Sequence, residues 1–213
     1  MAVIGLTAGA YLARAALVAH QTCQSVRSYE KSVGAVQTIG SGPERITVIG
    51  DSYATGDTLK DRGDAWVDDL ATQQNATVSV LAQGGTGYTN AGFCGDSTYD
   101  TRVADVAATR PDLVIVEGGL NDTDTSPSDE RAAAERVYRS LRHYDVAVVG
   151  PVDVPAVEGE RRVDDALKRA TRAQGATYVS ALDWHIDLGP DEKHPSPSGH
   201  AAFATNLATS LGL

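Results

Sequence analysis

The sequence predicts one three-layer α/β domain, in which helices cover both faces of a five-stranded parallel sheet with strand order 2-1-3-4-5. Two observations support this fold class. Short apolar, β-branched runs alternate five times with segments of helical period, and glycine-rich or polar turns separate the two types. The 213 residues, 42% apolar and 22% charged, suffice for one domain with a substantial core and are unlike a disordered or fibrous chain.

The predicted strands are near-continuous apolar runs, which is typical of parallel strands buried on both faces. They lie at Ile46–Ile49, Thr77–Leu81, Leu113–Val116, Val146–Val149 and Thr177–Val179. Helical periodicity follows at about 63–74, 98–109, 128–143, 158–173 and 198–211. Ser128 begins one of these helices as an N-cap with acidic residues in the first turn. Together these elements predict a single domain over residues 44–213.

The N-terminal region has a different composition from the rest of the chain. The stretch from Ala2 to Ala19 is apolar except for Thr7 and Arg14, and its length is about that of a membrane span. We therefore expect residues 1–22 to anchor the protein to a membrane, with a cleaved signal sequence or an amphipathic soluble helix as alternatives. Residues 23–43 show no sustained apolar period and end in Gly-Ser-Gly-Pro, which indicates a linker or stalk.

Charge and cysteine content narrow the possible functions. The formal net charge of −10 argues against a nucleic-acid-binding protein, which needs a basic surface to meet phosphates. The two cysteines, Cys23 and Cys94, suit an oxidising compartment, and either a disulfide between them or two unpaired thiols is compatible with the sequence. Their spacing does not indicate a metal site, and the oligomeric state is left open.

Small and polar residues follow each of the first three predicted strands at once. Gly50-Asp51-Ser52 follows the first strand, Gln83 to Gly87 the second, and Gly118 to Asp122 the third. The carboxyl ends of neighbouring parallel strands meet at one edge of the sheet, where ligands bind in such folds. A fourth polar cluster, from Asp191 to His200, lies between the last strand and the last helix and starts from the same edge.

These clusters supply the parts of a nucleophilic hydrolase. A serine hydroxyl needs a base to take its proton, and the base needs a group that orients it. Ser52 is the candidate nucleophile, His194 the base and Asp191 the orienting carboxylate. The backbone N–H groups of Ser52 and Gly85 and the side-chain amide of Asn121 are the candidate donors to a developing oxyanion.

Four segments resemble the sequence blocks of the SGNH hydrolases, also called the GDSL esterase/lipase family. They are VIGDSYATG (48–56), the Gly-Gly-Thr-Gly turn (84–87), GLND (119–122) and DEKHPS (191–196), in the order of that family. The resemblance implies a flavodoxin-like fold and hydrolysis of esters of lipids, acylated sugars or thioesters. It carries the family's functional residues to Ser52, Gly85, Asn121, Asp191 and His194, although the family glycine could also be Gly84. Tyr53 stands where the family often has leucine.

Other polar residues have simpler interpretations. A second Gly-Asp-Ser, at residues 95–97, follows a loop and is interpreted as a helix cap. Asp51 and Asp122 are expected to hydrogen-bond their own turns, and His200 to be a structural residue at a helix start. Asp183, His185 and Asp187 alternate but are expected to lie in a solvated loop, so the sequence predicts no metal ion and no cofactor.

The sequence therefore predicts a serine esterase that acts on carboxylic esters outside the cytoplasm. Short acyl groups on envelope glycans or lipids are the expected substrates, because the chain has few aromatic residues and no long insertion. Two alternatives remain open: an acyltransferase to a sugar or lipid hydroxyl that uses the same three residues, and a catalytically silent, membrane-tethered binding module. The expected location is extracytoplasmic and membrane-anchored, with a secreted form as the alternative.

Overall fold

The computed structural model describes the backbone of residues 3–34 and 36–213 and the side chains of residue 14 and of residues 16–34 and 36–213. Among these residues a six-stranded sheet has the order β1-β3-β2-β4-β5-β6. Its strands are β1 (Gln37–Ile39), β2 (Glu44–Gly50), β3 (Ala76–Ala82), β4 (Leu113–Glu117), β5 (Val146–Val149) and β6 (Thr177–Val179). Strands β2 to β6 are parallel and correspond to the five predicted strands in the predicted order.

The helices of the structure include the five predicted segments, with differences in two of them. They are α1 (Val3–Val33), α2 (Ser52–Thr55), α3 (Trp66–Gln73), α4 (Tyr99–Arg102), α5 (Val106–Thr109), α6 (Pro127–Ser140), α7 (Glu160–Gln174) and α8 (Pro197–Leu211). The segment 98–109, predicted as one helix, consists of α4 and α5 joined by a 3-10 turn. Ser126 caps α6 by accepting a hydrogen bond from the Asp129 amide, so the cap lies two residues before the predicted Ser128.

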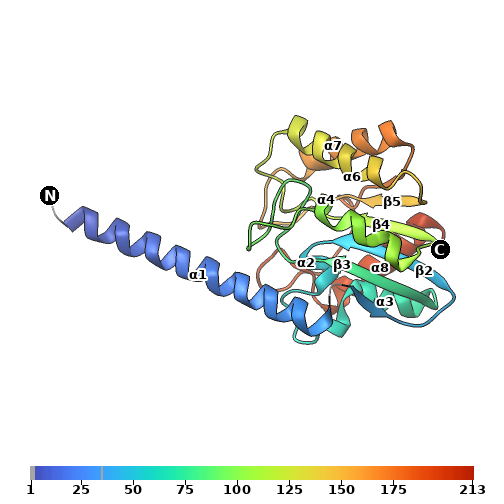
Figure 1. The fold of residues 1–213 in the computed structure, drawn as a ribbon, viewed down its shortest axis with the longest axis horizontal. Coiled ribbons are helices and arrows are strands. Elements are labelled where there is room, and N and C mark those ends of the chain that lie inside the picture. Colours follow the sequence, from blue (N-terminus) through green and yellow to red (C-terminus); the bar gives the residue numbers. More distant parts are fainter. Residues whose placement is uncertain (1–2, 35) are drawn as a thin grey trace.

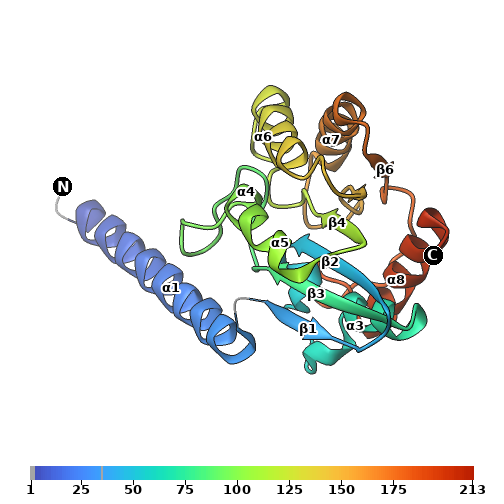
Figure 2. The same cartoon turned by 45° about the vertical axis from the view of Figure 1, so that its right-hand side comes forward.

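Helices cover both faces of the sheet, as Figures 1 and 2 show. Helices α3 and α8 pack on one face, and α4 to α7 pack on the other. Alternate residues of each strand enter opposite cores, because successive side chains of a strand point to opposite faces. Ile115 of β4, for example, lies in the core under α3 and α8, whereas Val114 and Val116 lie in the core under α6 and α7.

The sheet has one strand more than the sequence predicted. Strand β1 pairs antiparallel with β3, with Gln37 opposite Val80 and Ile39 opposite Val78. It is only three residues long and half-exposed, so its sequence lacks the apolar run that marks the central strands. The predicted linker over residues 23–43 therefore contains an edge strand.

The first part of the predicted linker is helical, because α1 continues to Val33. Half-buried positions recur at Thr22, Cys23, Val26, Tyr29, Glu30 and Val33, which is the spacing of one helix face. Several of these residues are polar, so the face carries no apolar period in the sequence. Arg62 lies over the ring of Tyr29 at 3.9 Å, and this contact helps to hold the end of α1 on the domain.

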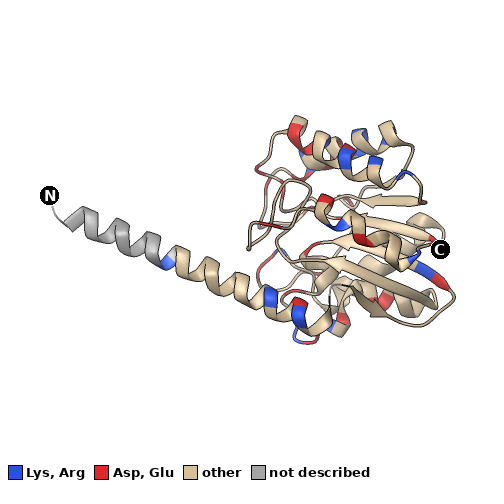
Figure 3. Ribbon diagram, viewed as in Figure 1, with Lys and Arg blue, Asp and Glu red and all other residues tan. Residues whose placement is uncertain are grey.

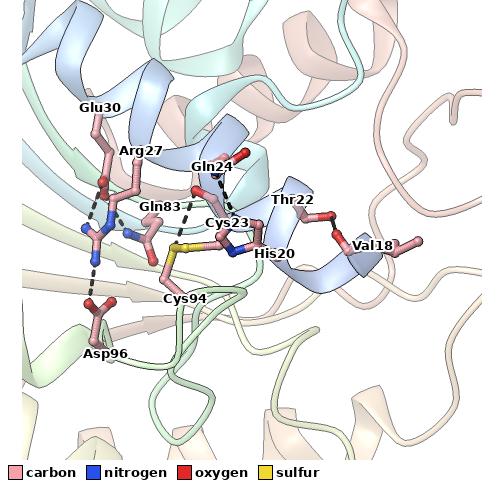
Figure 4. Close-up of a disulfide and its surroundings, with 10 residues drawn as sticks. All are labelled: Val18, His20, Thr22, Cys23, Gln24, Arg27, Glu30, Gln83, Cys94 and Asp96. Atoms are coloured by element: carbon pink, nitrogen blue, oxygen red, sulfur yellow. Dashed lines mark hydrogen bonds and ion pairs between the residues drawn. A yellow bond between two sulfur atoms is a disulfide. The ribbon is translucent and has the colours of Figure 1, made fainter. Parts of the chain in front are cut away.

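A disulfide between Cys23 and Cys94 joins α1 to the loop that follows β3 (Figure 4). Of the two states that the sequence left open, the structure has the bonded one. Arg27 pairs with Asp96 beside the disulfide, and Gln83 donates a hydrogen bond to Glu30. These contacts fix the second half of α1 next to the carboxyl edge of the sheet.

The first half of α1 projects away from the domain in both views (Figures 1 and 2). The predicted anchor, residues 1–22, falls largely on side chains outside the described residues. Within the described part of the chain, no helix is both long enough and apolar enough to span a membrane. On the domain itself, both basic and acidic residues lie along α6 and α7 (Figure 3), and Arg131 forms an ion pair with Glu135 on α6.

Candidate functional site

The fold brings the predicted residues to one edge of the sheet. Ser52 is the first residue of α2, directly after β2. Gly85 lies in the turn after β3, and Asn121 in the turn after β4. His194 lies in the loop between β6 and α8, so four separate segments contribute to one site.

Three of these residues form a hydrogen-bonded relay. The Nε2 atom of His194 lies 3.0 Å from the Oγ atom of Ser52. The Nδ1 atom of the same ring lies 2.6 Å from Oδ2 of Asp191. The relay places the hydroxyl, the imidazole and the carboxylate in the order that proton transfer from the hydroxyl requires.

Hydrogen bonds keep the Asp191 carboxylate ionised. The slight burial of Asp191 raises its pKa, but the bonds from the His194 ring, the His194 amide and the Lys193 amide outweigh this effect and lower the pKa to about 2. The carboxylate is thus a permanent negative charge beside the imidazole at neutral pH. It can hold the proton-bearing Nδ1 and stabilise an imidazolium.

A tight turn presents Ser52. Asp51 is the N-cap of α2, and its carboxylate accepts a hydrogen bond of 3.0 Å from the Tyr53 amide. Burial raises the pKa of Asp51 to about 6, and hydrogen bonding by the Tyr53 amide opposes that shift. Asp51 therefore holds its own turn, which agrees with the structural interpretation from the sequence.

The three predicted oxyanion donors follow three neighbouring strands, β2, β3 and β4. The Ser52 amide is in the first turn of a helix, where backbone N–H groups have no helical partner. Gly85 has φ of +77°, and its amide has no hydrogen-bond partner among the described residues. The positive φ favours glycine at this position, and a Cβ atom there would also lie 2.6 Å from the exposed ring of Phe93, which would have to shift.

The third donor is the side-chain amide of Asn121. Its Nδ2 atom donates to the Thr86 carbonyl at 2.9 Å and to Oδ2 of Asp51 at 3.2 Å. Its Oδ1 atom accepts a hydrogen bond of 3.2 Å from the Lys193 ammonium group. To donate to a substrate oxygen, Nδ2 must share or give up the longer of these bonds, the one to Asp51.

Asp122 organises the loop after the oxyanion turn. Its buried carboxylate accepts hydrogen bonds of 2.9 Å from the backbone amides of Tyr88, Thr89 and Asn90. The carboxylate thus ties the turn after β4 to the loop after β3. The role of Asp122 is structural, as predicted, but its carboxylate bonds the loop after β3 and not its own turn.

Sequence reasoning missed Arg102, a buried arginine that connects two parts of the site. Its guanidinium donates to the Gly50 carbonyl at 2.7 Å and to the Thr86 hydroxyl at 2.6 Å. The first contact holds the end of β2 just before Ser52, and the second holds the turn next to Gly85. In the sequence Arg102 looks like any surface arginine of a short helix, so no local signal could identify it.

The remaining polar candidates form no hydrogen bond with Ser52, His194 or Asp191 among the described residues. Asp96 of the second Gly-Asp-Ser pairs with Arg27, and the N-cap of α4 is Thr98 rather than Asp96 or Ser97, so the interpretation of that motif as a helix cap was wrong. His200 is fully buried, and its Nδ1 accepts a hydrogen bond of 3.2 Å from the Trp66 amide.

The alternating residues Asp183, His185 and Asp187 belong to no group of metal-ligand side chains in the described part of the chain. Asp187 has a structural contact instead. Its carboxylate accepts a hydrogen bond of 3.0 Å from the Ser198 hydroxyl, in the first turn of α8.

Comparison with known proteins gives the family. A model of the GDSL-like lipase/acylhydrolase family matches residues 48–202, whereas no curated protein matches the chain. A carbohydrate acetylesterase from Sinorhizobium meliloti has a similar structure, with a TM-score of 0.69, 15% identity, and 79% of this chain and 98% of that chain covered. The M. smegmatis aryl esterase has a TM-score of 0.68, 17% identity and the same two coverages. At these low sequence identities, the structural similarity shows a shared fold and no more. The family model spans most of the chain and includes Ser52, Asp191 and His194, so the chain belongs to the GDSL-like lipase/acylhydrolase family and is an ester hydrolase of the SGNH type.

Proposed function

We propose that the protein hydrolyses carboxylic esters through an acyl-enzyme intermediate on Ser52. The observation that carries this proposal is the relay itself: 3.0 Å from Ser52 Oγ to His194 Nε2, and 2.6 Å from His194 Nδ1 to Asp191 Oδ2. Both distances are within hydrogen-bonding reach before any substrate binds.

In the first half-reaction, Ser52 Oγ attacks the carbonyl carbon of the ester while His194 Nε2 takes the hydroxyl proton. The tetrahedral intermediate collapses as the bond to the alkoxy oxygen breaks, and His194 returns the proton to the leaving alcohol. Water then attacks the acyl-enzyme with His194 again as base. Collapse of the second intermediate releases the carboxylic acid and restores the Ser52 hydroxyl.

The negative charge that develops on the carbonyl oxygen needs donors that are already in place. The amides of Ser52 and Gly85 and the Nδ2 group of Asn121 are assigned this role. The Gly85 amide has no competing partner among the described residues, which supports its assignment.

We assign short acyl groups, with envelope glycans or lipids as the molecules that carry them. The site is accessible to solvent beside the catalytic base, since the side chain of Asp191 is 40% exposed and that of His194 is 15% exposed. The Sinorhizobium meliloti neighbour is a carbohydrate acetylesterase, which supports the same substrate class. A series of nitrophenyl esters of increasing acyl length, with kcat/KM for each, tests this assignment, and a maximum at about ten carbons or more contradicts it.

Labelling of the full chain with a fluorophosphonate tests the acyl-enzyme mechanism. We expect rapid, stoichiometric labelling of Ser52, identified by peptide mass spectrometry, and no labelling of the Ser52→Ala variant. Labelling at another serine, or none, contradicts the mechanism. Adding sugar or lipid alcohols to the ester assay then separates hydrolysis from acyl transfer, because a transferase forms the new ester in place of the free acid.

We also assign the protein to an extracytoplasmic compartment. The disulfide between Cys23 and Cys94 supports this assignment, because such bonds persist in oxidising compartments. Leu17 and Val18 are more than half exposed on the projecting part of α1, which is compatible with a membrane-facing segment. Fractionation of expressing cells, with thiol labelling before and after reduction, tests both points. Full-length protein in the cytosolic fraction with both thiols labelled before reduction contradicts them.

A further inference from the structure

Lys193 places a positive charge at the candidate oxyanion site. It lies between Asp191 and His194 in the sequence, and its ammonium group donates a hydrogen bond of 3.2 Å to Oδ1 of Asn121. The side chain is half-buried and forms no ion pair with a carboxylate among the described residues. Neither the family resemblance nor the relay assigns this residue a role.

The backbone of Lys193 is held at both of its polar groups. Its carbonyl oxygen accepts a hydrogen bond of 2.6 Å from the hydroxyl of Tyr53, and its amide donates to Oδ1 of Asp191 at 3.2 Å. Tyr53 is buried against the core and directly follows Ser52. These two bonds fix the backbone of Lys193 relative to Ser52. The side chain therefore starts from a fixed point, from which its ammonium group reaches Asn121.

The contact selects one orientation of the Asn121 amide. An ammonium group can only donate hydrogen bonds, so it requires Oδ1 of the amide on its own side. The NH2 group must then face the opposite side, toward the Thr86 carbonyl and Asp51. A cation on the amide oxygen also makes the N–H groups of that amide stronger donors, because hydrogen bonds in a chain polarise one another.

We propose that Lys193 is a positioning residue of the oxyanion hole, which acts through Asn121. Its ammonium group polarises the Asn121 amide and holds the NH2 group on the side of Asp51, the residue before Ser52, where the ester carbonyl oxygen replaces the longer bond, to Asp51. This inference rests on the proposed esterase function. The negative charge on the carbonyl oxygen is larger in the transition state than in the bound ester. The contribution of Lys193 therefore falls mainly on kcat and leaves KM nearly unchanged.

A double-mutant cycle on the full chain tests whether Lys193 acts through Asn121. We expect Lys193→Met, which removes the ammonium group and keeps an unbranched side chain one atom shorter, to lower kcat about tenfold with KM within about twofold. One complete oxyanion donor is worth more, about 10²–10³. In the Asn121→Ala background the same substitution is expected to change kcat by less than about twofold, because its target is gone. Equal effects in both backgrounds overturn the inference, as does a tenfold rise of KM with unchanged kcat.

Chemical rescue separates the charge of Lys193 from its packing. The native cysteines are bonded to each other, so a Lys193→Cys variant has one free thiol, at position 193. Alkylation of that thiol with 2-bromoethylamine restores an ammonium group on a side chain as long as that of lysine. We expect this reaction to restore at least half of the lost kcat, and iodoacetamide, which leaves the side chain neutral, to restore little.

Lys60→Cys, at an exposed position away from the site, is the matched control and should keep the wild-type kcat through both alkylations. A correctly folded Lys193→Cys variant whose loss of kcat is not recovered by bromoethylamine overturns the inference. Failure of the Lys193 inference is distinguishable from failure of the proposed esterase function. The esterase mechanism fails if Ser52→Ala remains active or if the fluorophosphonate does not label Ser52, whereas the role of Lys193 fails if Lys193→Met has the wild-type kcat.

Discussion

The hydroxyl of Tyr53 donates a hydrogen bond of 2.6 Å to the carbonyl oxygen of Lys193, and this bond joins the turn that carries Ser52 to the loop that carries His194. The Tyr53 ring is 1% exposed and packs edge-on against Phe203, with a centroid separation of 6.0 Å. The family resemblance marked position 53 as a departure, because leucine is common there. In this chain the departure gives the turn a polar contact with the opposite loop that leucine could not make.

Replacement of Tyr53 by phenylalanine removes only that hydroxyl. We expect Tyr53→Phe to lower the free energy of unfolding by about 1–2 kcal/mol, because the Lys193 carbonyl loses its partner. We also expect kcat to fall severalfold, since His194 is one residue from the released carbonyl. Urea unfolding and ester hydrolysis measure the two effects. Tyr138→Phe, which removes another buried hydroxyl that bonds Tyr88 and no residue of the relay, is the control and should lower stability but not kcat.

The assignment of the relay has a direct test. Ser52→Ala and His194→Ala are each expected to lower kcat by about 10⁴–10⁶, because residues that act as a unit lose activity together. Asp191→Asn should also be severe, because the amide favours the wrong imidazole tautomer. Steady-state hydrolysis of a nitrophenyl ester gives these values.

Ser97→Ala is the matched control for Ser52→Ala, because both serines occur in a Gly-Asp-Ser sequence. The Ser97 amide bonds to the Ala91 carbonyl in a surface loop, so the variant should remain largely active. If Ser52→Ala kept more than about a tenth of the wild-type kcat, the assignment of the nucleophile would be wrong.

The parallel sheet and the relay could be predicted because their signals are local. Each strand is a continuous apolar run, and each candidate residue follows a strand end directly. The sheet order then brings the strand ends to one edge, so Ser52, Asn121 and His194 converge in the structure as expected. The order of the strands is enough to bring these residues together, although they are far apart in the sequence.

The contacts of α1 could not be predicted in the same way. Its half-buried face includes Cys23 and Glu30, and these are held by a disulfide and by a hydrogen bond from Gln83, respectively. Neither contact requires an apolar side chain, so the hydrophobic period that marks other helices is missing. The role of Arg102 could not be predicted for a related reason. Its partners are mainly backbone carbonyls, which leave no pattern in the sequence.

Asp122 offers a test of the loop beside the oxyanion turn. Asp122→Ala leaves the amides of Tyr88, Thr89 and Asn90 without their acceptor, so we expect the free energy of unfolding to fall by about 3 kcal/mol. kcat should fall as well, because the Thr86 and Asn121 contacts lie in the same turns. Asp124→Ala, two residues away and exposed, is the control and should change neither quantity. Retention of wild-type stability by Asp122→Ala would contradict this role.

The disulfide links stability to the wall of the site. Phe93 precedes Cys94, and its ring packs against Gly85. We expect the double variant Cys23→Ser, Cys94→Ser to lower the free energy of unfolding by about 2–4 kcal/mol, since the bond closes a loop between residues 71 positions apart. We also expect a change in KM, because Phe93 is no longer held to α1. Dithiothreitol should move the wild type toward the variant and leave the variant unchanged; equal stability of the two proteins would contradict the prediction.

The buried His200 predicts a loss of stability in acid. Its Nδ1 accepts a hydrogen bond from the Trp66 amide, and its Nε2 is buried without a partner among the described residues. Burial, and to a smaller extent the charge of His194, lowers the pKa of His200 to about 4 from an ordinary value of 6.5. The unfolded chain therefore binds a proton at a higher pH than the folded chain does. The contribution of His200 to stability is complete above pH 6.5 and is lost as the pH falls through 4.

The shift corresponds to about 3 kcal/mol of unfolding free energy. Asp51 and Glu130 have pKa values raised by burial, to about 6 and about 9, so they favour the folded state in acid and oppose the effect. The measurement is therefore the difference between the wild type and His200→Asn, whose Oδ1 can still accept from the Trp66 amide. By urea unfolding, we expect the variant to be less stable than the wild type at pH 7.5 and the gap to close by pH 4. An exposed His143→Asn control should keep the wild-type pH dependence, and a gap for His200→Asn that stays constant with pH would show that His200 does not titrate with folding.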